Sequence, residues 1–461
     1  MSRLPLLVLF ALGLGTTMSG CRGRGVPGAA RPDETDTGDW AAWLRLEPVV
    51  DAARHHASAP IADGIAEAGA LAARGRIRAA DARLARLAAA GGDPWVAVAR
   101  ADLAAFYFVQ CVKGVAFRLA DTEPGVAPPV GARERIDGED VRVAPEDVSV
   151  EALLEGLERA LAMQVPELTV HAQMARARVA AYAAACPPNP EVARRAAEVM
   201  RADLAELAAA GRLAPDLAFM WGGIQMSEYS GAAARPFLHQ ARKGGFDDPS
   251  LPLMLAIADK DAGDLRAART WALEARARFS ASKDQGLEAE AEFLLGELAA
   301  LEGDVAGATR HYRAARRLDP RHVHALIGEA TIRLRTSGEA DAVDFLARTL
   351  ADSFAPKAWT AETAEAIVAL GEGLVLAAGD EPALVQALRD ALLRDVDAAP
   401  DGAARALRYF FAATLDARLA EYERARGHAL LARQEQEGAG IELPISVDEL
   451  LESLPEAAGA P

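Results

Sequence analysis

The stretch from Ala289 to Pro320 constrains this chain of 461 residues more than any other part of its sequence. It contains an apolar-striped segment, a break at Gly303-Asp304, a second helical segment and a proline. Gly303 can adopt the left-handed conformation that closes a helix, and Asp304 can cap the helix that follows. Pro320 cannot continue a helix interior. The pattern therefore predicts a hairpin of two helices.

Small residues mark the face on which these two helices would meet. Ala308, Tyr312 and Ala315 are spaced by four and three residues, which places them on one face of the second helix. Gly296 and Ala308 would let the two backbones approach closely, with Tyr312 filling the space beside them. A single hairpin cannot bury its apolar face alone, so we expect neighbouring copies to stack against it.

Weaker copies of the pattern occur on both sides of this stretch. Gly75 and Gly263-Asp264 mark two further turns, and Gly328 fits a further first helix after Pro320. Alanine occupies most of the matching helix positions, which are Ala68, Ala80, Leu84, Ala256, Ala268, Ala275, Ala413, Ala425, Ala429 and Ala432. The copies predict a chain built from repeated helical hairpins.

Composition supports helices throughout. Apolar residues make up 51% of the chain but aromatic residues only 5%, and alanine and leucine supply the excess. Such a composition favours helices in close contact over large sheets, and runs of β-branched residues are almost absent. The predicted fold class is all-α.

The spacing resembles the tetratricopeptide repeat (TPR), a helix-turn-helix unit of about 34 residues. Six residues match that pattern, namely Leu295, Gly296, Ala308, Tyr312, Ala315 and Pro320. Glu292 and Ala299 stand where the family has aromatic residues, and the resemblance is best over residues 250–337. It implies a right-handed α-solenoid of TPR-like repeats whose first helices line a concave groove for a partner. By those positions the groove residues would be Glu290, Phe293, Glu297, Glu329 and Arg333.

Residues 1–20 predict a lipoprotein signal peptide. An apolar run from Leu4 to about Leu14 is too short to span a membrane. Met18-Ser19-Gly20-Cys21 resembles the bacterial lipobox, with methionine in place of the usual leucine, and this resemblance implies acylation of Cys21. Arg22 follows where an aspartate would retain such proteins in the inner membrane, which implies an outer-membrane anchor facing the periplasm. Secretion with an incidental cysteine is the alternative.

The rest of the chain divides by composition. We expect a flexible tether over 21–39, N-terminal helical repeats over 40–120, a Pro/Gly-rich insertion over 121–148, the TPR-like array over 149–437 and a C-terminal tail over 438–461. Within the insertion, Asp137-Gly138 between alternating residues predicts a short β-hairpin, and a disordered loop is the alternative.

The net charge limits the kinds of partner that we expect, and the cysteine content limits the possible disulfides. The formal net charge of −17 disfavours nucleic acid, because phosphate binding needs clustered positive charge, and it favours a basic partner. With Cys21 assigned to lipidation, Cys111 and Cys186 remain. Two alternatives are open for this pair: a disulfide between them, or two buried thiols on separate helices.

We find no known catalytic motif in the sequence. It contains no Walker-type phosphate loop, HExxH, GxSxG or CxxC. His322 and His324, two residues apart, should point to nearly opposite sides of a helix. We therefore predict a protein that is not an enzyme and that uses no cofactor or metal.

Two functional hypotheses follow. The first is a non-catalytic scaffold or assembly factor that is lipid-anchored in the cell envelope, faces the periplasm and binds envelope proteins. The second is a periplasmic lipoprotein that binds a small molecule, lipid or glycan through the stretch from Phe219 to Tyr229, which includes Trp221. That stretch also fits a well-packed core helix, because close packing can compensate for its paired glycines.

Overall fold

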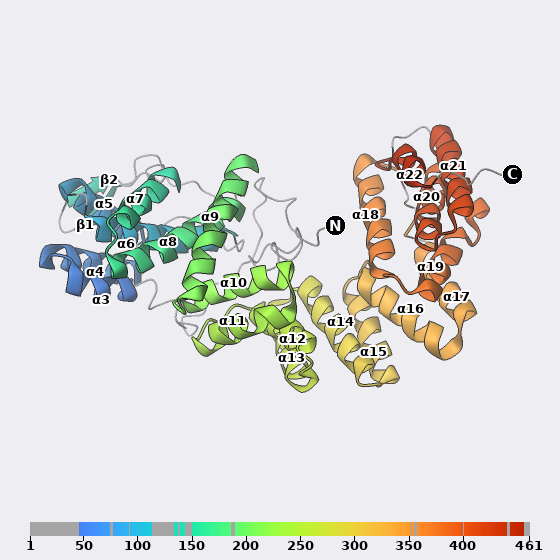
Figure 1. Cartoon of the computed structure of the whole chain (residues 1–461), viewed down its shortest axis with the longest axis horizontal. Helices are drawn as coiled ribbons and strands as arrows, with labels where there is room; N and C mark the ends of the chain where they lie inside the picture. The colour runs from blue at the N-terminus through green and yellow to red at the C-terminus, as the bar shows by residue number, and fades with distance from the viewer. Residues whose placement is uncertain are drawn as a thin grey trace. The chain divides into compact units, whose positions relative to one another are not determined.

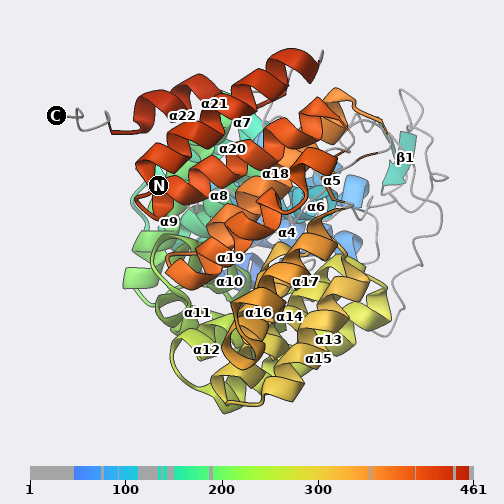
Figure 2. The same ribbon diagram turned by 90° about the vertical axis from the view of Figure 1, so that its right-hand side faces the viewer.

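The computed structural model describes residues 46–73, 77–91, 93–112, 133–136, 139–142, 150–185, 190–351, 353–354, 356, 358–399, 401–439 and 443–455. Helices dominate this part of the chain, which confirms the all-α prediction (Figure 1, Figure 2). The chain divides into two compact units, Met1–Asp264 (unit 1) and Leu265–Pro461 (unit 2). The division falls within the predicted array 149–437, at the Gly263-Asp264 turn.

Unit 1 is a succession of helices, each packed against its neighbours in sequence. They are α3 (Glu47–His56), α4 (Ala59–Ala73), α5 (Ile77–Gly91), α6 (Pro94–Val112), α7 (Val150–Ala162), α8 (Pro166–Ala185), α9 (Pro190–Ala209), α10 (Pro215–Glu228), α11 (Gly231–Lys243) and α12 (Leu251–Asp261). Proline is the first residue of α6, α8, α9 and α10, where its fixed φ suits the first turn and its missing N–H is not needed.

Two short strands also belong to unit 1. Strands β1 (Arg133–Ile136) and β2 (Glu139–Arg142) pair antiparallel, with Ile136 opposite Glu139 and Arg133 opposite Arg142. They lie within residues 121–148, on either side of Asp137-Gly138 in the sequence.

A buried ion cluster joins three helices of unit 1. Arg178 of α8 donates through Nε to Asp216 of α10 at 2.7 Å and through Nη1 to Asp102 of α6 at 2.8 Å. Burial acts to lower the pKa of Arg178, but the two carboxylates more than offset it and raise that pKa. Because all three side chains are buried, each needs the others to remain charged.

Unit 2 continues the same succession. Its elements are α13 (Leu265–Ser282), α14 (Gln285–Leu301), α15 (Val305–Leu318), α16 (Val323–Ser337), α17 (Glu339–Ala351), α18 (Ala361–Ala377), α19 (Pro382–Leu393), the short 3₁₀ helix η2 (Val396–Ala398), α20 (Gly402–Arg418), α21 (Tyr422–Ala439) and α22 (Val447–Ser453). Helices α14 and α15 lie side by side, as do α20 and α21 (Figure 1, Figure 2).

The turn between α14 and α15 has the predicted chemistry. Gly303 has a φ of 80°, in the left-handed region that favours glycine. The Asp304 side chain caps α15 by accepting a hydrogen bond from the backbone N–H of Gly307 at 2.8 Å. Gly263 and Gly338 have φ values of 83° and 90°. The turns predicted at Gly263 and Gly303 are therefore confirmed, whereas the turn predicted at Gly75 lies outside the described residues.

Tyr312 occupies the space predicted for it. A Cβ atom added to Gly296 of α14 would lie 2.6 Å from the Tyr312 ring, and one added to Gly328 of α16 would lie 2.7 Å from it. The ring therefore sits against two helices at positions where only glycine fits. The repeat positions predicted from the sequence are fully buried, namely Ala68, Ala80, Leu84, Ala256, Ala268, Ala275, Ala308, Ala315, Ala413, Ala425, Ala429 and Ala432.

The C-terminal residues that the structure describes pack on the last hairpin. Val447 of α22 is buried in one apolar cluster with Ala429 and Ala432 of α21. Arg433 of α21 pairs with Asp448 in the first turn of α22. The part of the predicted C-terminal tail 438–461 that contains α22 therefore packs against α21.

Replacing Gly296 with alanine tests the contact with Tyr312. Because the added Cβ would clash with the ring, we expect Gly296→Ala to lower the free energy of unfolding by about 1–3 kcal/mol. Chemical denaturation followed by circular dichroism measures it. Gly427→Ala is the control, since Gly427 lies inside α21 with nothing within 4 Å of an added Cβ. That change should raise stability by about 0.5–1 kcal/mol. Equal effects would contradict the contact.

Candidate functional site

The five residues predicted to line a groove lie on two helices and in two different surroundings. Glu290, Phe293 and Glu297 belong to α14, and Glu329 and Arg333 belong to α16. The first three lie near Tyr312, His322 and His324, and this set is called the Phe293 cluster. The other two join Arg313, Arg316, Asp341 and Phe345, and this set is called the Glu329 cluster.

Aromatic rings form the centre of the Phe293 cluster. The half-buried Phe293 ring lies 5.2 Å from the His322 ring, 5.7 Å from the His324 ring and 5.9 Å from the Tyr312 ring, measured between centroids. His324 is exposed. Residues from α14, α15 and α16 thus meet in one aromatic surface that is open on the side of His324.

His322 and His324 do not point to opposite sides of a helix, so that prediction was wrong. His322 is the N-cap residue of α16, and its Nδ1 accepts a hydrogen bond from the backbone N–H of Ala325 at 3.2 Å. A cap residue has non-helical backbone angles, so the 100° advance per helical residue does not apply to it. The two rings lie 6.4 Å apart and edge to face.

Carboxylates flank this aromatic surface. The buried Nε2 of His322 lies 3.5 Å from Oε1 of Glu290, too long for a good hydrogen bond, and the Glu290 side chain is 39% exposed. Burial, and to a smaller degree the charge of Glu297, raises the pKa of Tyr312 to about 12, so its phenol stays neutral at ordinary pH. Aromatic faces beside carboxylates suit a cationic side chain.

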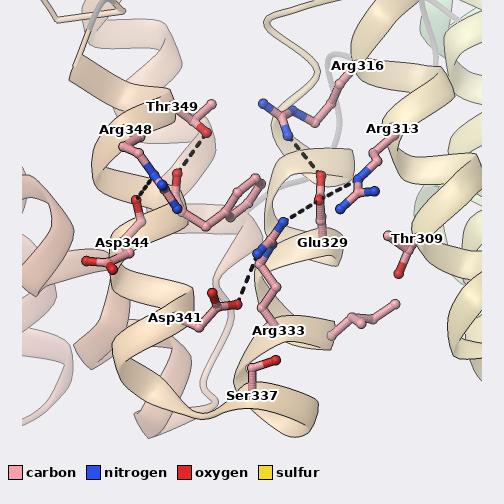
Figure 3. Close-up of polar contacts among 12 residues, drawn as sticks. Thr309, Arg313, Arg316, Glu329, Arg333, Ser337, Asp341, Asp344, Arg348 and Thr349 are labelled. Atoms are coloured by element: carbon pink, nitrogen blue, oxygen red, sulfur yellow. Dashed lines mark hydrogen bonds and ion pairs between the residues drawn. The ribbon is translucent and has the colours of Figure 1, made fainter.

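The Glu329 cluster is built around one buried carboxylate. Arg313 Nε and Arg316 Nη1 each donate to Glu329 at 2.9 Å, and Arg333 Nη2 donates to it at 3.2 Å (Figure 3). Arg333 Nη1 also donates to Asp341 of α17 at 3.0 Å. Glu329 is only 1% exposed. The prediction that Glu329 lines an open groove was therefore wrong, because its buried carboxylate forms internal ion pairs instead.

Phe345 of α17 holds two of these arginines in place. The guanidinium carbon of Arg333 lies 4.4 Å from the centre of the Phe345 ring, and that of Arg316 lies 5.1 Å from it. Phe345 itself is buried. Cation–π contacts on both guanidiniums restrict their rotamers, so the cluster is fixed rather than loosely solvated.

The same design recurs at two other buried acids of unit 2. Glu292 of α14 lies 2.7 Å from His311 Nδ1 of α15 and accepts from Arg276 of α13 at 3.4 Å. Although burial acts to raise it, the pKa of Glu292 is lowered by His311 and Arg276. Asp416 of α20 similarly meets Arg389 of α19 and His428 of α21. Each acid therefore links the helix before it to the helix after it.

A sequence signal for these pairs exists. The arginine precedes its acid by 16 residues in both Arg276–Glu292 and Arg313–Glu329. That spacing places one residue on the second helix of a hairpin and the other on the next first helix.

The alternative ligand-binding stretch is packed as core over most of α10, while Trp221 is half-buried and Tyr229 is exposed. Phe219, Gly222 and Met226 of α10 are buried. A Cβ added to Gly222 would lie 2.7 Å from the Leu238 side chain of α11, so close helix packing accounts for this glycine. Trp221 contacts Phe237 edge-on at 6.3 Å.

Several predicted sites lie outside the described part of the chain. Cys21 and Cys186 fall outside the described residues, and Cys111 belongs to α6 without a described side chain. The disulfide and the lipidation therefore remain predictions. Among the described residues, none group as metal ligands, and no helix is long and apolar enough to span a membrane.

Comparison with known proteins gives no relative: no protein-family model and no curated protein matches the chain.

Neutralising Glu329 tests the central pairing of its cluster. Glu329→Gln keeps the shape but leaves three guanidiniums around an uncharged amide, so we expect the free energy of unfolding to fall by roughly 3 kcal/mol. Urea denaturation measures it. Glu290→Gln is the control, because that side chain is 39% exposed, and its effect should stay within about 0.5 kcal/mol. A Glu329→Gln protein as stable as the control would refute the assignment.

Proposed function

We propose that this protein is a non-catalytic scaffold or assembly factor, lipid-anchored at Cys21 on the periplasmic side of the outer membrane. In this proposal its helical hairpins form a right-handed α-solenoid of TPR-like repeats, and it binds envelope proteins. Three observations support the repeats: the glycine turns, the buried alanine positions and the seat of Tyr312 against Gly296 and Gly328. The anchor rests on the lipobox resemblance of Met18-Ser19-Gly20-Cys21.

The Phe293 cluster is the observation that carries the binding role. It joins the half-buried ring of Phe293 and the exposed ring of His324 to the carboxylates of Glu290 and Glu297, and its His322 Nε2 is buried without a hydrogen-bond partner. Helix α14 has four glutamates and no lysine or arginine. A basic segment of a partner would place its cationic side chains against these rings and acids, so we assign the cluster to such a segment.

No specific observation favours a small-molecule, lipid or glycan site at residues 219–229. The buried side chains of Phe219 and Met226 serve helix packing in unit 1. The scaffold is therefore the single function proposed.

Replacing Cys21 tests the anchor. Without the thiol to acylate, Cys21→Ala should accumulate as an uncleaved precursor that incorporates no labelled fatty acid. Electrophoretic mobility and acyl labelling measure both effects. Cys111→Ala is the control, and it should be processed and labelled normally. Normal processing of Cys21→Ala would show that the cysteine is incidental.

Reversing the charge of Glu290 and Glu297 tests the partner surface. The double variant Glu290→Lys/Glu297→Lys repels a basic segment, so we expect recovery of the partner from cross-linked cell envelopes to fall about tenfold or more. The lipidated full-length chain is the bait, and quantitative mass spectrometry is the readout. Glu423→Lys/Glu437→Lys makes the same change of net charge at exposed positions of α21. If both variants capture the partner as the wild type does, the Phe293 cluster is not the binding surface.

A further inference from the structure

Opposite charges are carried by consecutive helices of unit 2. Helix α15 contains four arginines and no acidic residue, whereas α14, the helix before it, contains four glutamates and no basic residue. In a chain with a net charge of −17, α15 is therefore a local concentration of positive charge. The Phe293 cluster uses the acidic helix, and the function proposed above gives no role to the basic one.

Much of the hydrogen-bonding capacity of these arginines is unused by described residues. Arg313 donates only through Nε, and its side chain is 52% exposed. Arg316 donates through one Nη, and its Nε is buried without a partner. A guanidinium has five N–H groups, so one carboxylate, Glu329, leaves the outer donors of Arg313 and Arg316 available.

The charges of the cluster do not cancel. Three guanidiniums, from Arg313, Arg316 and Arg333, face two carboxylates, from Glu329 and Asp341. Figure 3 places Arg313 and Arg316 on α15 to one side of Arg333, and Arg348 of α17 to the other. The exposed Arg348 lies at that edge beside Asp344, and its Nε donates to the backbone carbonyl of that residue.

Two of the three guanidiniums are also held in place before any ligand arrives. Arg316 and Arg333 both stack on Phe345, and their side chains are only 21% and 25% exposed. An anionic group that binds here has little side-chain entropy left to remove, which favours affinity. The planar fork of a guanidinium matches the two oxygens of a carboxylate, and each of the three arginines gives only one hydrogen bond to Glu329.

We propose that the surface between α15 and α17, formed by Arg313, Arg316 and Arg333, binds an acidic segment of a protein partner through its carboxylates. Charge complementarity selects the occupant, because three guanidiniums face two carboxylates here and the outer donors of Arg313 and Arg316 are unused by described residues. The inference goes beyond the scaffold proposal, since it adds a second surface of opposite charge to that of the Phe293 cluster. Such a protein holds a basic and an acidic segment at once.

Binding of a glutamate-rich peptide to the purified full-length protein tests this surface. We expect saturable binding of the fluorescein-labelled peptide in fluorescence anisotropy at low ionic strength. Arg313→Glu should weaken it about tenfold or more, because it removes charge-assisted hydrogen bonds and adds repulsion. Arg313→Lys keeps the charge but loses the fork, so its affinity should fall between the two. Circular dichroism checks that each variant is folded.

Arg266→Glu is the matched control. Arg266 is an exposed arginine of α13 outside the cluster, and its reversal makes the same change of net charge. Its affinity for the peptide should stay within about twofold of the wild type. The proposal is overturned if the wild type does not bind the peptide, if Arg313→Glu binds it unchanged, or if Arg266→Glu weakens it equally. It is also overturned if the wild type binds anionic phospholipid vesicles but not the peptide.

The peptide experiment is separate from the test of the scaffold proposal. Glu290→Lys/Glu297→Lys leaves the three arginines intact, so it should not weaken binding of the acidic peptide. Loss of envelope capture with peptide binding retained would leave the surface between α15 and α17 standing even if the Phe293 cluster were misassigned.

Discussion

Burying a carboxylate between helices costs free energy unless cationic side chains reach it. Unit 2 buries such carboxylates, with cationic partners, at Glu292, Glu329 and Asp416. Each acid accepts from an arginine of the helix before it, Glu292 and Asp416 also meet a histidine of the helix after, and Glu329 also accepts from Arg333 of its own helix. Breaking such a pair leaves an uncompensated charge, at a cost of roughly 3–5 kcal/mol. The clusters therefore fix which residues of successive helices face each other.

This constraint matters where alanine supplies much of the contact between helices, as it does between α14 and α15. Alanine at Ala308 and Ala315 permits a close approach of helices, but small side chains give an interface little distinctive shape. Tyr312 against Gly296 and Gly328 is a specific exception, since only one register places both glycines on the ring. Small residues thus allow the helices to approach, and the ion clusters with this one aromatic contact select the register.

Features that depend on local chemistry could be predicted from the sequence. The Gly303 turn, the Asp304 cap and the buried alanines follow from backbone conformation and helical spacing alone. The environment of Glu329 was not predicted, because an acid on a first helix has the same hydrophobic pattern whether it faces solvent or three arginines. Only the 16-residue spacing from Arg313 signals the pair. The orientation of His322 was predicted wrongly because a cap residue has non-helical backbone angles, so the advance of 100° per residue does not apply to it. The Glu329 cluster also requires Phe345 of α17, whose approach to α15 only the folded chain provides.

The central claim is that the α14–α16 surface around Phe293 contacts a protein partner. The most direct measurement is photo-cross-linking in intact cells. A photo-cross-linking amino acid replaces the exposed His324 in the full-length lipidated chain, and the cells are then irradiated. The account predicts one discrete covalent adduct with an envelope protein, absent when the same amino acid replaces Leu273 of α13, which is 40% exposed. No adduct at position 324, or the same adducts from both positions, would contradict it.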